Sequence, residues 1–154
     1  MRQYETSQDG SRLRIGVAVS RFNSVVTERL LEGALEALKK HGVADDAIEV
    51  AHVSGAFELP LLADMYARSQ RLDAIVALGA VVRGETPHFD MIATWVVAEL
   101  GRLGTQYHLP IALGVLTTDT LEQALERAGG AHGNKGAEAA VVAIEMANLD
   151  RQFA

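Results

Sequence analysis

The sequence predicts an α/β fold, a three-layer sandwich in which helices cover both faces of a four-stranded parallel sheet. Apolar runs of strand length alternate with stretches of helical periodicity, and no long spacer separates them. One run, Ala74 to Val82, is almost entirely apolar, which is typical of a strand buried on both faces of a parallel sheet. The 154 residues can bury a substantial core, so we expect a single domain over residues 1–154.

The first half of the chain supplies two strand–helix pairs. The expected elements are a strand over 14–20, a helix over about 25–41, a strand over 48–53 and a helix over about 58–70. Asn23 or Ser24 can cap the first helix, and Gly42 ends it. The polar residues 1–12 are expected to fray unless something pairs with them.

The second half repeats the pattern. The expected elements are a strand over 73–82, a helix over about 87–107, a strand over 111–116, a helix over about 120–127 and a final helix over about 135–149. Thr86 and Pro87 have the side chains preferred at the N-cap and at the first position of a helix. The segment 129–134 breaks the pattern before the last helix.

Composition excludes several classes of protein. A net charge of −6 leaves no basic footprint, so neither nucleic acid nor an anionic membrane is an expected partner. The absence of cysteine excludes disulfides and thiolate chemistry, and the five histidines lack metal-ligand spacing, so no metal is expected. No apolar run suits a signal peptide or a membrane span, which makes the cytoplasm the expected location.

In an open parallel sheet, ligands bind beyond the carboxyl ends of the strands. Three of the loops expected there contain side chains that turn chemistry does not require: Phe22, the pair Phe57-Glu58, and His88. Phe22 offers a stacking surface for a planar ligand. The Gly84–Thr86 turn enters a helix N-terminus, where free N–H groups and the helix dipole favour an anion, and His88 can transfer protons near neutral pH.

Several residues in or near these loops also have a purely structural interpretation. Phe22 can be a hydrophobic staple, Glu58 a first-turn acid and Asp119 an N-cap. Lys135 and Glu138 have the spacing of a surface ion pair. The helix over 120–127 is expected to carry Arg127 about 12 Å from the sheet edge, so that it either binds its own helix end or serves a neighbouring subunit.

Five motifs occur in a characteristic order along the chain. They are Arg21-Phe22-Asn23, Ser54-Gly55-Ala56-Phe57-Glu58-Leu59-Pro60, Arg83-Gly84-Glu85-Thr86-Pro87-His88-Phe89-Asp90, Gly114-Val115-Leu116-Thr117-Thr118-Asp119-Thr120 and Gly133-Asn134-Lys135-Gly136. With these motifs the chain closely resembles the 6,7-dimethyl-8-ribityllumazine synthase family of riboflavin biosynthesis, from about residue 12 to its end. The resemblance implies a flavodoxin-like sheet with strand order 2-1-3-4.

The family's reaction follows as an expectation. This transferase condenses the amine of 5-amino-6-(ribitylamino)uracil with 3,4-dihydroxy-2-butanone 4-phosphate to an imine, eliminates phosphate, and closes the ring with loss of water. No cofactor or metal is used.

The resemblance also assigns roles by position. Phe22 would stack on the pyrimidine, His88 would shuttle protons, and Arg127 would face the phosphate. The remaining positions divide into ribityl contacts (Ala56, Phe57, Glu58), a ring pocket (Ala80, Val81, Val82), phosphate contacts (Gly84, Glu85, Thr86) and further substrate contacts (Leu113, Lys135, Glu138). Relatives often have Phe at position 113 and Trp at position 57, so this chain departs from the family pattern at both.

In the family the site lies between adjacent subunits of a pentamer. The short 129–134 connection resembles that of relatives whose pentamers form icosahedral capsids, so we expect a 60-subunit shell, within which riboflavin synthase is a possible partner. The N-terminal segment would then add a strand to a neighbour's sheet.

Two other functions compete with the enzyme. A flavin- or lumazine-binding protein would keep the pocket without turnover. The presence of both His88 and Arg127 argues against that alternative. A structural shell protein would show incidental catalysis. Without the resemblance, the residues indicate a phosphate-binding α/β domain, such as a phosphatase.

Overall fold

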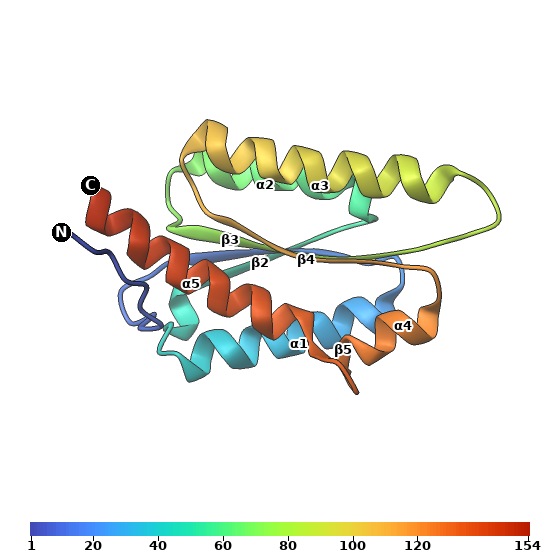
Figure 1. Ribbon diagram of the computed structural model, residues 1–154, viewed down its shortest axis with the longest axis horizontal. Helices are drawn as coiled ribbons and strands as arrows, with labels where there is room; N and C mark the ends of the chain where they lie inside the picture. Colours follow the sequence, from blue (N-terminus) through green and yellow to red (C-terminus); the bar gives the residue numbers. More distant parts are fainter.

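The computed structural model describes residues 1–154 and has the three layers that the sequence predicts (Figure 1). Four parallel strands lie in the order β2-β1-β3-β4, which confirms the expected order. The strands are β1 (Ile15–Ser20), β2 (Ile48–Val53), β3 (Ala74–Val82) and β4 (Ile111–Thr118). Helices α2 (Leu59–Ser69) and α3 (His88–Tyr107) cover one face, and α1 (Ser24–Lys40), α4 (Leu121–Glu126) and α5 (Lys135–Phe153) the other.

The two central strands are buried on both faces, as their apolar runs predict. Every residue of β1 is buried, and so are the first seven of β3. Because side chains alternate along a strand, Val17 and Val19 face the core beneath α1 and α5, whereas Ala18 faces the core beneath α2 and α3. Alternation therefore divides the apolar residues of one strand between two cores.

Several element bounds differ from the expected ones. Strand β4 continues through Thr118 because its last two residues pair with Val81 and Val82, and α5 continues to Phe153. Helix α4 is shorter than expected, and the segment expected as a break forms a small hairpin of β5 (Ala128–Gly130) and β6 (Gly133–Asn134). Short 3-10 turns at Asp45–Ala47 (η1) and Ala56–Glu58 (η2) precede β2 and α2.

Three helix caps also depart from expectation. Helix α3 begins one residue late, with Pro87 at the cap position, while the Thr86 hydroxyl still accepts from the His88 N–H at 3.4 Å. Helix α4 is capped by Thr120, whose hydroxyl accepts from the Gln123 N–H, and not by Asp119, whose carboxylate binds Arg83 instead. Asn23 occupies the N-cap of α1, but its side chain makes no capping bond.

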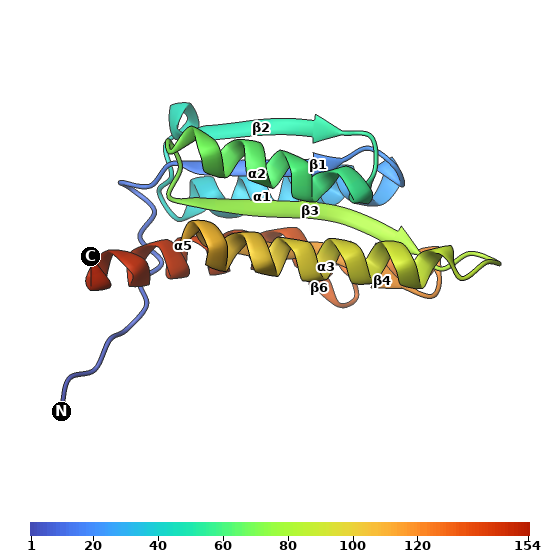
Figure 2. The same ribbon diagram turned by 90° about the horizontal axis from the view of Figure 1, so that it is seen from above.

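The N-terminal tail forms no strand within the chain. It lies along α5, where the Asn148 amide donates to the Ser7 and Asp9 carbonyls and the rings of Tyr4 and Phe153 stack with centroids 4.4 Å apart. Both termini lie at the end of the molecule opposite the β3–α3 loop (Figure 2). None of the helices has the length and apolar composition needed to cross a membrane.

Candidate active site

A cavity of about 250 Å³ opens at the carboxyl ends of β1 and β3. It collects nine of the residues named from the sequence: Phe22, Ala56, Phe57, Ala80, Val81, Val82, Gly84, Thr86 and His88. Asn23, Gly55, Phe89 and Ile92 complete its wall. Three expected loops, far apart in the sequence, therefore meet at one place, as the rule for parallel sheets predicts.

The β1–α1 turn is held in place by hydrogen bonds to both neighbouring strands. The Phe22 N–H donates to the Ser54 carbonyl at 2.9 Å, and the Asn23 side-chain amide donates to the Ala80 carbonyl at 3.0 Å. Asn23 adopts the left-handed conformation (φ 63°) that Asn tolerates better than most residues. The Phe22 side chain is 71% exposed, so it is not packed against its own helix as a staple would be.

Phe57 is the second exposed aromatic side chain on the cavity. It belongs to η2, and Trp95 of α3 supports it with a ring contact at 5.7 Å and a long hydrogen bond (3.5 Å) from the indole N–H to the Phe57 carbonyl. The Glu58 carboxylate accepts from the Gly55 N–H at 3.0 Å, a capping contact that agrees with its structural interpretation. Neither Glu58 nor Glu85 lines the cavity.

His88 is the first residue of α3 and is exposed beside the cavity. The preceding loop brings Gly84 and Thr86 to the same wall, and the main-chain N–H groups of Glu85 and Thr86 make no hydrogen bond within the chain. This end of the cavity can therefore accept an anion and transfer a proton, while the Phe22 end offers a flat aromatic surface.

Arg127, Lys135 and Glu138 line a second pocket, of about 370 Å³, between the end of β4 and the start of α5. His88 and Arg127 line different pockets. Helix α4 has only six residues, and Arg127, which follows it, shares the wall of this pocket with Thr117 and Thr118 of β4. Its guanidinium donates to the Gln123 carbonyl at 3.0 Å, so the helix-end interpretation is confirmed.

Two features of this second pocket were not predicted. His132 shares its wall, and the imidazole Nε2 lies 3.6 Å from the Glu126 carboxylate. The glycine-rich segment 129–134 indicates only a break before the last helix, and nothing in its residues shows that a hairpin brings His132 to the same pocket as Arg127. Lys135 and Glu138 do not form the expected ion pair; they share the pocket wall instead.

Leu113 lies in neither pocket. It stands on β4, an edge strand, and is 39% exposed. The residues named from the sequence therefore form a group around His88, a group around Arg127 and an isolated position. No cluster of three or more histidine or carboxylate side chains is arranged to hold a metal.

Comparison with known proteins is consistent with this geometry. Residues 12–151 match the family model described as 6,7-dimethyl-8-ribityllumazine synthase. A protein of that name from a species of Anaeromyxobacter is 52% identical over 154 residues, which cover 100% of this chain and 94% of the relative. Another, from Kosmotoga olearia, is 51% identical over 153 residues, which cover 99% of this chain and 98% of the relative.

Proposed function

Because the chain belongs to the 6,7-dimethyl-8-ribityllumazine synthase family, we infer that it carries out that family's reaction. It condenses 5-amino-6-(D-ribitylamino)uracil with 3,4-dihydroxy-2-butanone 4-phosphate and releases phosphate and water, in the penultimate step of riboflavin biosynthesis. The observation that carries this inference is the match over residues 12–151, together with relatives about half identical over nearly their full length.

The residues around the cavity support separate roles in this reaction. We assign the pyrimidine ring to the face of Phe22 and the edges of Ala80–Val82, and the ribityl chain to the Ala56–Glu58 turn. We assign the phosphate to the start of α3, where the main-chain N–H groups of Glu85 and Thr86 would donate to it. These groups bind the two substrates side by side, which lowers the entropic cost of their condensation.

His88 moves the protons that the reaction requires. Imine formation takes a proton from the attacking amine and gives one to the departing water, and phosphate elimination removes a proton from the carbon chain. An exposed imidazole between the ring site and the phosphate site can reach both substrates. Such positioned proton transfer contributes typically ~10²–10⁴-fold to the rate.

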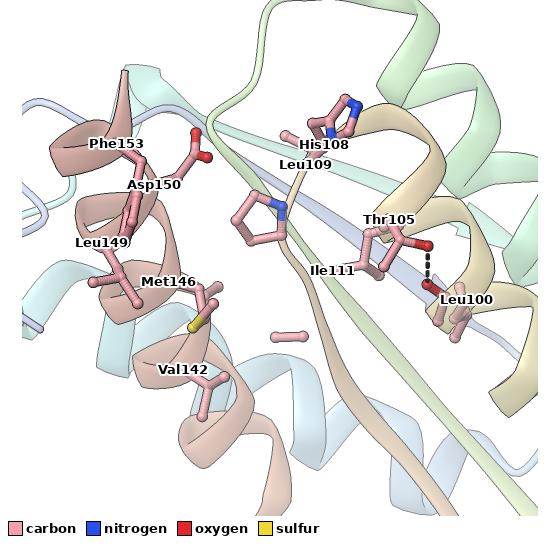
Figure 3. A pocket seen from close by; sticks show the side chains of 15 residues that line it. Leu100, Thr105, His108, Leu109, Ile111, Val142, Met146, Leu149, Asp150 and Phe153 are labelled. Atoms are coloured by element: carbon pink, nitrogen blue, oxygen red, sulfur yellow. Dashed lines mark hydrogen bonds between the residues drawn. The ribbon is translucent and has the colours of Figure 1, made fainter.

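We propose that a neighbouring copy completes the site. Leu113, Arg127, Lys135 and Glu138 lie outside the His88 cavity of their own chain, although the family uses these positions at the substrate. A cavity of about 490 Å³, lined mainly by apolar residues, lies along the edge strand β4 between α5 and the end of α3 (Figure 3). Leu100, Ile111, Val142 and Met146 line this groove, which supports a packed interface there.

The assembly we propose is built from pentamers, twelve of which form a shell, with each N-terminal tail adding a strand to a neighbour's sheet. Native mass spectrometry tests it: multiples of five 16.5 kDa chains support the pentamer, and sixty copies the shell. A monomer that retains full activity would contradict the shared site.

The reaction itself is tested by a steady-state assay with both substrates that follows lumazine absorbance and released phosphate together. Equal rates of the two products are expected. Pyrimidine binding without turnover would favour the binding protein instead, and phosphate release without lumazine would favour a phosphatase.

A further inference from the structure

The segment between β3 and α3 has few contacts of its own. Residues 83–88 are exposed, and the open space around Gly84 would accommodate a side chain. Between Gly84 and His88 the one side-chain hydrogen bond is the 3.4 Å contact from the His88 N–H to the Thr86 hydroxyl. The loop projects beyond the sheet (Figures 1 and 2), so its position depends on how its two ends are held.

Arg83 contacts two separate segments at the base of this loop, the end of β4 with the residue after it and the first turn of α3. Its main-chain N–H donates to the Thr118 carbonyl at 2.9 Å, and its guanidinium Nε donates to the Asp119 carboxylate at 2.8 Å. The Nη1 atom lies 3.5 Å from the Asp90 carboxylate, and the guanidinium carbon lies 4.4 Å from the centre of the Phe89 ring. We call Arg83, Phe89, Asp90 and Asp119 the clasp.

The clasp joins the two ends of the loop to the neighbouring β4–α4 turn. Asp90 and Phe89 belong to the first turn of α3, directly after His88, and Asp119 follows β4. The planar guanidinium contacts both carboxylates and the ring at once, which a lysine ammonium cannot reproduce. The hydrogen bond to Asp119, and more weakly the charge of Asp90, raise the pKa of Arg83, so the group stays charged.

Two carboxylates on one guanidinium argue against Arg83 as a ligand of the substrate phosphate. An anion approaching it would meet a local excess of negative charge. Exposed ion pairs add little to stability, but an error of about 1 Å in the placement of a reacting group can cost ~10²-fold in rate. The clasp is therefore expected to influence catalysis more than folding.

We propose that Arg83 is a positioning residue, which through Asp119 and Asp90 fixes His88 and the phosphate-binding N–H groups relative to the end of β4. The proposal rests on the proposed function. The positioning role and a phosphate-binding role of Arg83 predict opposite effects of removing the Asp119 charge. If Arg83 bound the phosphate, the change would free it to bind phosphate better. If the clasp positions the loop, the change would weaken use of the phosphorylated substrate.

The experiment compares Arg83→Met, Asp119→Asn and the double variant with the wild type. Each single variant is expected to lower kcat/KM for the phosphorylated substrate by about tenfold, with pyrimidine affinity unchanged within about twofold. The double variant is expected to be no worse than either single one, because both remove the same unit. Arg71→Met and Glu49→Gln disrupt an exposed bidentate pair near the amino ends of the strands, whereas Arg83 follows the carboxyl end of β3, and they serve as controls expected to leave kinetics unchanged.

Three kinetic outcomes would overturn the proposal: improved use of the phosphorylated substrate by Asp119→Asn, equal losses for both substrates, or additive losses in the double variant. Hydrogen exchange of a peptide spanning 83–92 provides a readout that needs no turnover. Exchange is expected to be faster in all three variants, and unchanged exchange would also reject the clasp. An inactive wild type would refute the proposed function, while the exchange result would still decide whether the clasp orders the loop.

Discussion

Helices α3 and α5 are of nearly equal length and lie on opposite faces of the sheet, yet they bury different surfaces. Helix α5 has 19 residues and buries six: Gly136, Ala139, Ala140, Ala143, Ile144 and Ala147. Helix α3 has 20 residues and buries three: Val96, Leu100 and Leu103. The small residues of α5 pack against α1. Both helices also expose apolar side chains, Val142, Met146 and Phe153 on α5 and Met91, Trp95 and Val97 on α3.

The two cores reflect the same difference. The cluster beneath α1 and α5 has 24 buried residues, and the cluster beneath α2 and α3 has 12. The α1/α5 face therefore holds the larger core, while the α2/α3 face holds His88 and Phe57 at its end. We infer that substitutions will affect stability most on the first face and activity most on the second.

The largest expected effect concerns activity on the α3 side. His88→Ala should reduce kcat by ~10²–10⁴-fold, because positioned proton transfer is lost, and should leave the melting temperature and assembly unchanged. The steady-state assay and light scattering check both. Turnover at the wild-type rate would remove His88 from the mechanism.

The next effect concerns stability on the α5 side. A Cβ at Gly136 would lie far inside van der Waals contact of the Leu30 carbonyl oxygen of α1, so Gly136→Ala should cost about 1–3 kcal/mol in the free energy of unfolding. Denaturant unfolding measures the cost. An unchanged midpoint would mean that α1 and α5 can move apart at little cost, which would contradict their close packing.

The matched substitution on α3 should have the opposite sign. A Cβ at Gly101 would meet no atom within 4 Å, so Gly101→Ala should stabilise the chain by about 0.5–1 kcal/mol through helix propensity. The same unfolding measurement applies. A loss of stability would show that α3 packs closely against something at this position.

The smallest expected effect depends on pH and concerns the contact between α2 and α3. The Tyr107 hydroxyl donates to the Asp64 carboxylate at 2.5 Å and, with Arg68, lowers the pKa of Asp64 below 3.8. A carboxyl whose pKa is lower in the folded state stabilises the protein above its unfolded pKa, and this contribution is lost as the pH falls through the folded value. Asp64→Asn should therefore cost about 0.5 kcal/mol at pH 7.

The stabilities of the wild type and of Asp64→Asn should converge as the pH falls below the lowered folded pKa of Asp64, where the wild-type carboxyl is also protonated. A stability difference that persists unchanged into acid would assign the effect to packing and not to charge.

Some features of the structure follow from local sequence alone. The apolar runs of β1 and β3 predict strands buried on both faces, and Gly42 marks the end of α1 with a φ of 94°. The convergence of Phe22, Phe57 and His88 follows as well, because parallel strands place their carboxyl ends at one edge. In each case the cause is the spacing of apolar residues or the backbone freedom of one residue.

Other features depend on partners that are distant in the sequence. The length of α4 and the hairpin after it place Arg127 beside Thr118, Asn23 binds the Ala80 carbonyl instead of its own helix, and Asp119 binds Arg83 instead of capping α4. Each of these polar groups could form a hydrogen bond with a residue near it in the sequence, and the packed chain brings a second, distant partner within reach. The sequence by itself determined the layers and the edge at which the site lies. Only the tertiary structure decided which polar groups meet there, because hydrogen bonds of similar strength are selected by packing and not by residue type.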